Sequence, residues 1–68
     1  MKHIIKIRKD VYYTKEANVS LELEAMGIER IGLEYKKNEP NKTIGWYYLI
    51  QENAINDIIA ELVRRLAL

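Results

Sequence analysis

The final quarter of the chain carries a single apolar stripe at helical spacing. Its members recur three and four positions apart and so line one face of a helix: Ile55, Ile58, Ile59, Leu62, Val63 and Leu66. Asn53 is a favourable N-cap residue, and Arg64 and Arg65 place positive charge near the end, where the helix dipole favours it. The pattern predicts a C-terminal amphipathic helix, which needs a second layer to cover its apolar face.

The segment before this helix is rich in β-branched and aromatic residues, which favours a strand over residues 43–50. Alternate residues of a strand point to opposite sides. One face therefore carries Ile44, Trp46, Tyr48 and Ile50, and the other carries Tyr47 and Leu49. A strand with two apolar faces needs cover on both, and a subunit contact is one way to supply it.

A second strand is indicated upstream, where Ile31, Leu33 and Tyr35 alternate with smaller or polar residues. Between the two strands lies the sequence Asn-Glu-Pro-Asn at positions 38–41, which is rich in turn-forming residues. We therefore expect the two strands to pair as a hairpin.

Residues 17–25 admit two interpretations, the first of which is a strand. Apolar residues alternate strictly with polar ones, as in a half-buried strand. If residues 3–13 form the preceding strand and 14–16 the turn, Lys6 lies opposite Glu24 and Arg8 opposite Glu22, so opposite charges meet. Lys9 falls opposite Leu21 as the one misfit, which a bulge near Lys9 and Asp10 would resolve. This interpretation predicts an α+β fold of order β-β-β-β-α, an antiparallel meander closed by the C-terminal helix.

The second interpretation makes residues 17–25 a helix. The sequence Glu-Ala-Met-Gly-Ile at 24–28 is typical of a helix that ends at a glycine C-cap before a strand. The element order would then be β-α-β-β-α, a ferredoxin-like or ACT-like arrangement. Both interpretations give a small α+β fold.

Size and composition predict one domain over residues 1–68. A chain of 68 residues can bury only about 60% of the surface that its unfolded form exposes, so its stability margin is thin and self-association would widen it. The absence of cysteine excludes disulfides and thiolate chemistry and suits the cytoplasm. The apolar run at the N-terminus is too short for a signal peptide, and no segment is long enough to span a membrane.

Residues that could carry catalysis have simpler explanations. The single histidine, His3, has no ligand partners at metal-binding spacing, and Gly27 and Gly32 fit no nucleotide-binding loop. Glu22 and Glu24 share a face of the proposed strand, but each would have a cationic neighbour across it. We therefore expect no enzyme activity, catalytic residue, cofactor or metal.

The leading functional expectation is a non-catalytic binding or regulatory module that acts as a homodimer or as a protein-interaction subunit. Its motivation is the apolar excess of the 43–50 strand and the final helix, which exceeds what one copy can cover. The residues expected at this interface are Trp46, Tyr48, Ile50, Ile59, Leu62 and Leu66.

The alternative is a protein that binds single-stranded or duplex DNA. Aromatic side chains can stack on bases while cations hold the phosphate backbone. The residues expected to do so are Lys6, Arg8, Lys36, Lys37 and Tyr47. Against it, the net charge is only +1, and an excess of basic residues in positions 1–15 is followed by an excess of acidic residues in 16–34. Such alternation favours pairing within the chain over a broad basic field.

Overall fold

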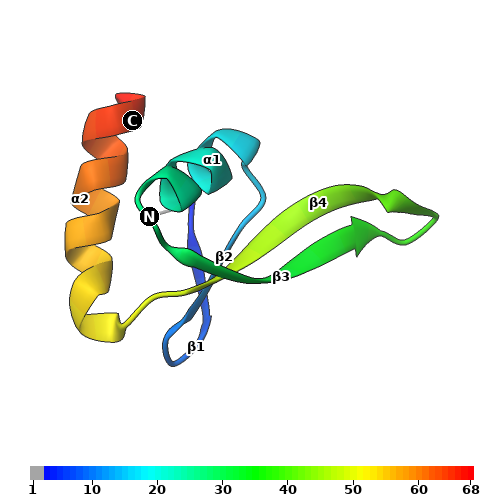
Figure 1. The fold of residues 1–68 in the computed structure, drawn as a ribbon, viewed down its shortest axis with the longest axis horizontal. Helices are drawn as coiled ribbons and strands as arrows, with labels where there is room; N and C mark the ends of the chain where they lie inside the picture. Colours follow the sequence, from blue (N-terminus) through cyan, green and yellow to red (C-terminus); the bar gives the residue numbers. More distant parts are fainter. Residues whose placement is uncertain (1–2) are drawn as a thin grey trace.

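The computed structural model describes residues 3–68 as a four-stranded antiparallel sheet with two α-helices, which confirms the small α+β fold. The strand order across the sheet is β1-β2-β4-β3 (Figure 1). The elements in chain order are β1 (Ile5–Arg8), β2 (Val11–Thr14), α1 (Ala17–Ala25), β3 (Glu29–Lys36), β4 (Glu39–Leu49), a 3-10 turn η1 (Glu52–Ala54) and α2 (Ile55–Leu66).

The N-terminal segment is a tight hairpin, so the expectation of one long strand with a bulge was wrong. The chain reverses at Lys9 and Asp10, and Ile5 pairs with Tyr13 across β1 and β2. Asp10 adopts a left-handed conformation with φ 63°, which aspartate tolerates better than most residues. Its carboxylate accepts a hydrogen bond of 2.9 Å from the backbone N–H of Glu52, which ties this turn to the start of η1.

Residues 17–25 form α1, so their assignment to a strand was also wrong. On a helix the alternating apolar residues separate into two stripes, as a 3.6-residue period requires. Val19 and Leu23 are fully buried, whereas Leu21, on the other stripe, is 69% exposed. The fold uses only one of the two stripes, and the strict alternation was a local coincidence.

A glycine motif ends α1, as the second interpretation expected. Gly27 has φ +79°, and its N–H donates to the carbonyl of Glu24 at 3.0 Å while that of Ile28 donates to Leu23 at 3.0 Å. These paired bonds form a Schellman motif, which satisfies the last helix carbonyls and turns the chain into β3. The second interpretation was still incomplete, because two strands precede α1 where it expected one.

The β3–β4 hairpin is confirmed, but its turn lies at Lys37 and Asn38 rather than over 38–41, because β4 already begins at Glu39. Tyr35 to Lys42 are exposed, and Figure 1 shows this end of the hairpin extending away from both helices. Register shifts interrupt the pairing of β3 with β4, one of them between Arg30 and Gly32. Such bulges increase the local twist.

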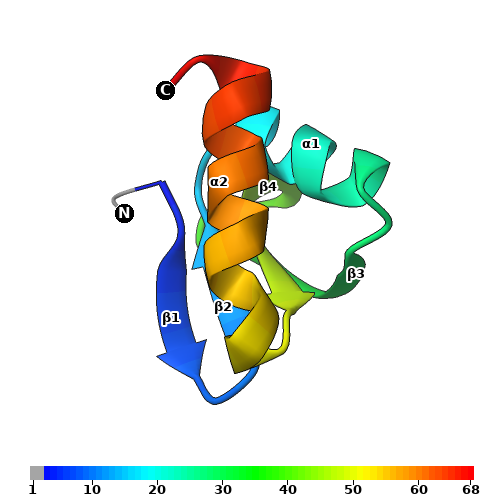
Figure 2. The same ribbon diagram turned by 90° about the vertical axis from the view of Figure 1, so that its left-hand side faces the viewer.

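The core lies between the helices and one face of the sheet. Its buried residues are Ile4, Tyr12, Val19, Leu23, Tyr48, Ile50 and Leu62. Figure 2 shows α2 in front of β2 with α1 beside it. The apolar stripe of α2 provides further contacts from residues such as Ile58 and Ile59. Asn53 lies within η1, and α2 begins at Ile55 without a side-chain cap, so the expected N-cap was wrong.

The cross-strand charge pairs expected for a strand at 17–25 are replaced by others. Lys6 pairs with Glu52 at 3.1 Å instead of with Glu24. Glu24 lies 3.6 Å from Arg30 on β3. Glu22 pairs across the helices with Arg65 of α2 at 3.2 Å. These pairs do not join the basic residues of 1–15 to the acidic residues of 16–34, because Lys6 pairs with Glu52 and the glutamates pair with Arg30 and Arg65.

Candidate interaction surface

The side of the sheet away from the helices forms an apolar surface, which we call the open sheet face. Tyr12 and Tyr48 face the core and are paired in register, so their neighbours Tyr13 and Tyr47 point the other way. Extending the alternation across the paired strands defines the open sheet face by Ile5, Ile7, Val11, Tyr13, Tyr47 and Leu49. Val11 and Tyr13 are only 4% and 5% exposed, so the accessible apolar surface of this face comes from Ile5, Ile7, Tyr47 and Leu49.

Several residues of this face are unusually exposed for their type. Ile5 is 49% exposed, Ile7 50% and Leu49 45%, whereas Val11 between them is 4% exposed. Both helices pack on the other side of the sheet, where they contact Tyr48 and the rest of the core. These exposed aliphatic side chains share one sheet face, which makes that face the candidate surface considered below.

The centre of the open sheet face is held rigidly. The rings of Tyr13 and Tyr47 lie 4.8 Å apart between centroids, and the Tyr13 hydroxyl donates a short hydrogen bond to the Glu34 carboxylate. Burial and this hydrogen bond to Glu34 raise the pKa of Tyr13 to about 12. The aromatic pair therefore has little freedom to lose when a partner binds.

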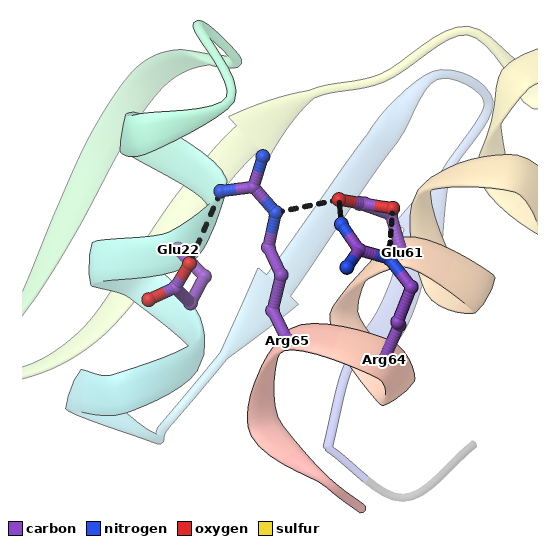
Figure 3. A network of polar contacts seen from close by, with 4 residues as sticks. All are labelled: Glu22, Glu61, Arg64 and Arg65. Carbon is purple, nitrogen blue, oxygen red and sulfur yellow. Dashed lines mark hydrogen bonds and ion pairs between the residues drawn. The ribbon is translucent and has the colours of Figure 1, made fainter.

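On the helix side, charged residues are paired with one another and bind α1 to α2. Arg65 donates to Glu61 at 2.7 Å and to Glu22 at 3.2 Å, and Arg64 donates to Glu61 as well (Figure 3). Hydrogen bonds from Arg64 and Arg65, the Arg64 bond foremost, lower the pKa of Glu61 to about 2. This network uses its charges within the chain.

A second polar cluster connects the sheet to α1. The Tyr48 hydroxyl donates to the Glu24 carboxylate at 2.7 Å and lies 3.0 Å from the Ser20 hydroxyl. Ser20 is 4% exposed and Tyr48 is fully buried, whereas the Glu24 side chain is 40% exposed, so the cluster reaches from the core to the surface. Burial raises the pKa of Tyr48 to about 12, while Ser20 opposes and Glu24 adds to that shift. Its role is to satisfy a buried hydroxyl and fix α1 on the sheet.

The interface residues expected from the sequence lie mainly on the core side. Tyr48, Ile50 and Leu62 are at most 2% exposed within a single copy, so they have no surface left to offer. Trp46, Ile59 and Leu66 are partly buried against the same core. The available apolar surface is instead the other face of β4 together with β1. The sequence signal for it was the second apolar face of the 43–50 strand.

The residues expected to bind nucleic acid do not converge. Lys6 pairs with Tyr12, which in turn pairs with Tyr48 of β4. Lys36 pairs with Glu39, which lies nine positions before Tyr48 in β4. Nine strand residues span about 30 Å. Arg8 lies with Lys6 on β1, Lys37 is in the distant turn, and Tyr47 packs on Tyr13. Lys6 and Lys36 each already have an acidic partner.

Residues 3–68 contain no group of three ligand-type side chains and no pocket. His3 lies 2.5 Å from Glu16 through Nδ1, and its carbonyl accepts a hydrogen bond from Thr14 at 2.7 Å. These contacts fasten the start of the chain to the segment between β2 and α1.

Comparisons with known proteins add no family or function. No protein-family model, curated protein or solved structure matches the chain. Neither helix in the part of the chain that the structure describes is long and apolar enough to cross a membrane.

Proposed function

We propose that this chain is a non-catalytic cytoplasmic binding module that acts as a homodimer and uses the open sheet face as its dimer surface. The observation that supports the proposal is the exposure of Ile5, Ile7 and Leu49 on a sheet face with no helix over it. Packing two such faces together would bury them in a sheet-on-sheet core about 10 Å thick.

The size of the protein supports the same proposal. A chain of 68 residues has a small core, here built of seven buried residues between one sheet face and two helices. Each Å² of apolar surface removed from water contributes about 25 cal/mol. Covering the open sheet face would therefore add a second core to a domain whose stability margin is thin.

The test is the oligomeric state of a matched pair of leucine variants. Leu49→Asp places a charge in the open sheet face, while Leu21→Asp makes the same change at an exposed leucine of α1. Sedimentation equilibrium should give twice the 8.0 kDa chain mass for the wild type and for Leu21→Asp. Leu49→Asp should be a monomer with unchanged circular dichroism. A wild type that is monomeric at high micromolar concentration would refute the proposal.

A second candidate function is nucleic-acid binding at the end of the β3–β4 hairpin. Lys36, Lys37 and Lys42 are exposed there, away from the helices. Binding of this kind would be strongly weakened by salt, because it depends on counterion release. A Lys37→Glu, Lys42→Glu double variant should abolish any oligonucleotide binding that is seen at low ionic strength.

A further inference from the structure

We infer that the partner on the open sheet face is a second copy related by a two-fold axis parallel to the strands, with Arg8 of each copy paired to Glu29 of the other. This inference rests on the proposed function and specifies the geometry of its dimer. It follows from which residues share a row across the sheet and from which charges take part in no ion pair among residues 3–68.

One row of residues crosses the whole open sheet face and ends in opposite charges. Arg8 of β1 is paired with Val11, Val11 with Leu49, and Leu49 with Glu29 of β3. Residues paired in register point to the same side of a sheet. A register shift between Lys6 and Arg8 interrupts the alternation along β1, so the pairing with Val11 is what places Arg8 on the open side. The row therefore places a cation at the β1 edge, an anion at the β3 edge and two apolar side chains between them.

These two end charges differ from their neighbours on the helix side. Lys6 on β1 is paired with Glu52, and Arg30 on β3 is paired with Glu24. Among the ion pairs of residues 3–68, neither Arg8 nor Glu29 takes part. The edge charges Lys6 and Arg30 on the covered side therefore have ionic partners, whereas Arg8 and Glu29 on the open side have none among residues 3–68.

Only one orientation of the two-fold axis brings these charges together. An axis parallel to the strands keeps each row in place but lays the β1 edge of one copy over the β3 edge of the other, so Arg8 meets Glu29 twice. An axis perpendicular to the strands, along the row, lays each edge over itself and opposes Arg8 to Arg8. Like charges at an interface are unfavourable, so charge selects the first orientation.

The shape of the next row fits the same orientation. Ile5 of β1 is paired with Tyr13, Tyr13 with Tyr47, and Tyr47 with Gly32 of β3. The strand-parallel axis lays the 49% exposed side chain of Ile5 over Gly32, which has none. A large residue thereby faces a small one across the interface, as interdigitating sheet faces require.

Charge reversal tests the pairing. Arg8→Glu and Glu29→Arg should each weaken self-association about tenfold, because each opposes like charges at two symmetric places. An equimolar mixture of the two variants should form a heterodimer close to wild-type affinity, since both contacts then join Glu to Arg. Native mass spectrometry with one variant isotopically labelled distinguishes this heterodimer from either homodimer.

Lys9→Glu is the matched control, because it makes the same charge change at the exposed residue next to Arg8. When Lys9→Glu is mixed with Glu29→Arg, no heterodimer of wild-type affinity should form. If Leu49→Asp gives monomers but the reversed pair shows no rescue, the dimer uses this face in another orientation and the inference fails alone. If the wild type is monomeric, the proposed function fails with it.

Discussion

The ring of Tyr13 lies directly against the backbone of Gly45. A Cβ placed on Gly45 would come within 2.5 Å of the Tyr13 Cζ, a distance that real Cβ atoms do not reach. The glycine is required by this close approach, since it leaves room for the tyrosine to cross β4 and reach Glu34 on β3.

Gly45→Ala is therefore expected to destabilise the protein. The new methyl group must displace the Tyr13 ring or the backbone of β4, and overpacking of this kind costs about 1 to 3 kcal/mol. Urea unfolding followed by circular dichroism measures the change in the free energy of unfolding.

A double-mutant cycle isolates the cause. In a Tyr13→Val background the ring is gone, so Gly45→Ala should cost less than about 0.5 kcal/mol. An equal cost in both backgrounds would mean that the conformation of Gly45, rather than its contact with Tyr13, sets the penalty.

Tyr13 and Tyr48 should make the fold sensitive to alkaline pH. Burial raises the pKa of each to about 12, from an ordinary value of 10.0 that applies in the unfolded chain. Below pH 10 both states keep the proton, so this stability is fully present. As pH rises from about 10 to about 12, the unfolded state loses protons first and the free energy of unfolding falls.

Urea midpoints measured from about pH 8 to about pH 11.5 test this dependence. Tyr48→Phe should have a shallower decline over the upper part of that range. It should also be less stable at neutral pH by about 1 kcal/mol, because its hydrogen bond to Glu24 is lost. Tyr35→Phe, at a tyrosine that is 51% exposed, provides the control. A decline of the same steepness in Tyr48→Phe and wild type would contradict the assignment.

Arg65 should contribute more to stability than Arg64, although both are hydrogen-bonded to Glu61. Arg65 also reaches Glu22 on α1, so it joins the two helices, whereas the Arg64 pair stays within α2. Arg65→Gln is expected to lower the urea midpoint more than Arg64→Gln does at low salt. The difference should shrink in high salt, which screens exposed ion pairs. Equal midpoints at low salt would show that the link between the helices contributes nothing.

Local patterns in the sequence were sufficient to predict the C-terminal helix and the β3–β4 hairpin. The apolar stripe from Ile55 to Leu66 and the alternation in 31–36 each extend over enough residues to separate the two periods. Residues 17–25 were harder, because a short helix needs only a few inward residues. Val19 and Leu23 meet that need, and the tertiary contact of Tyr48 with Glu24 lies outside any local window.

The candidate surface was only partly predicted from the sequence, for a related reason. Tyr47 and Leu49 were recognised as a second apolar face of their strand, but the interface was assigned to the face with Trp46 and Tyr48. Choosing between the faces requires knowing that both helices cover one of them. Ile5 and Ile7 belong to the open sheet face only because the chain reverses at Asp10. That reversal was not predicted, because its left-handed turn lacks the usual glycine.

Changes at the exposed end of the β3–β4 hairpin are expected to leave the stability of the rest of the fold unchanged. Residues 35–42 are exposed and none belongs to the core cluster, so their backbone pairing is expected to break without unfolding the remainder. The turn at Lys37 and Asn38 is accordingly the place where extra residues, an epitope or a reporter group can be grafted without disturbing either apolar layer.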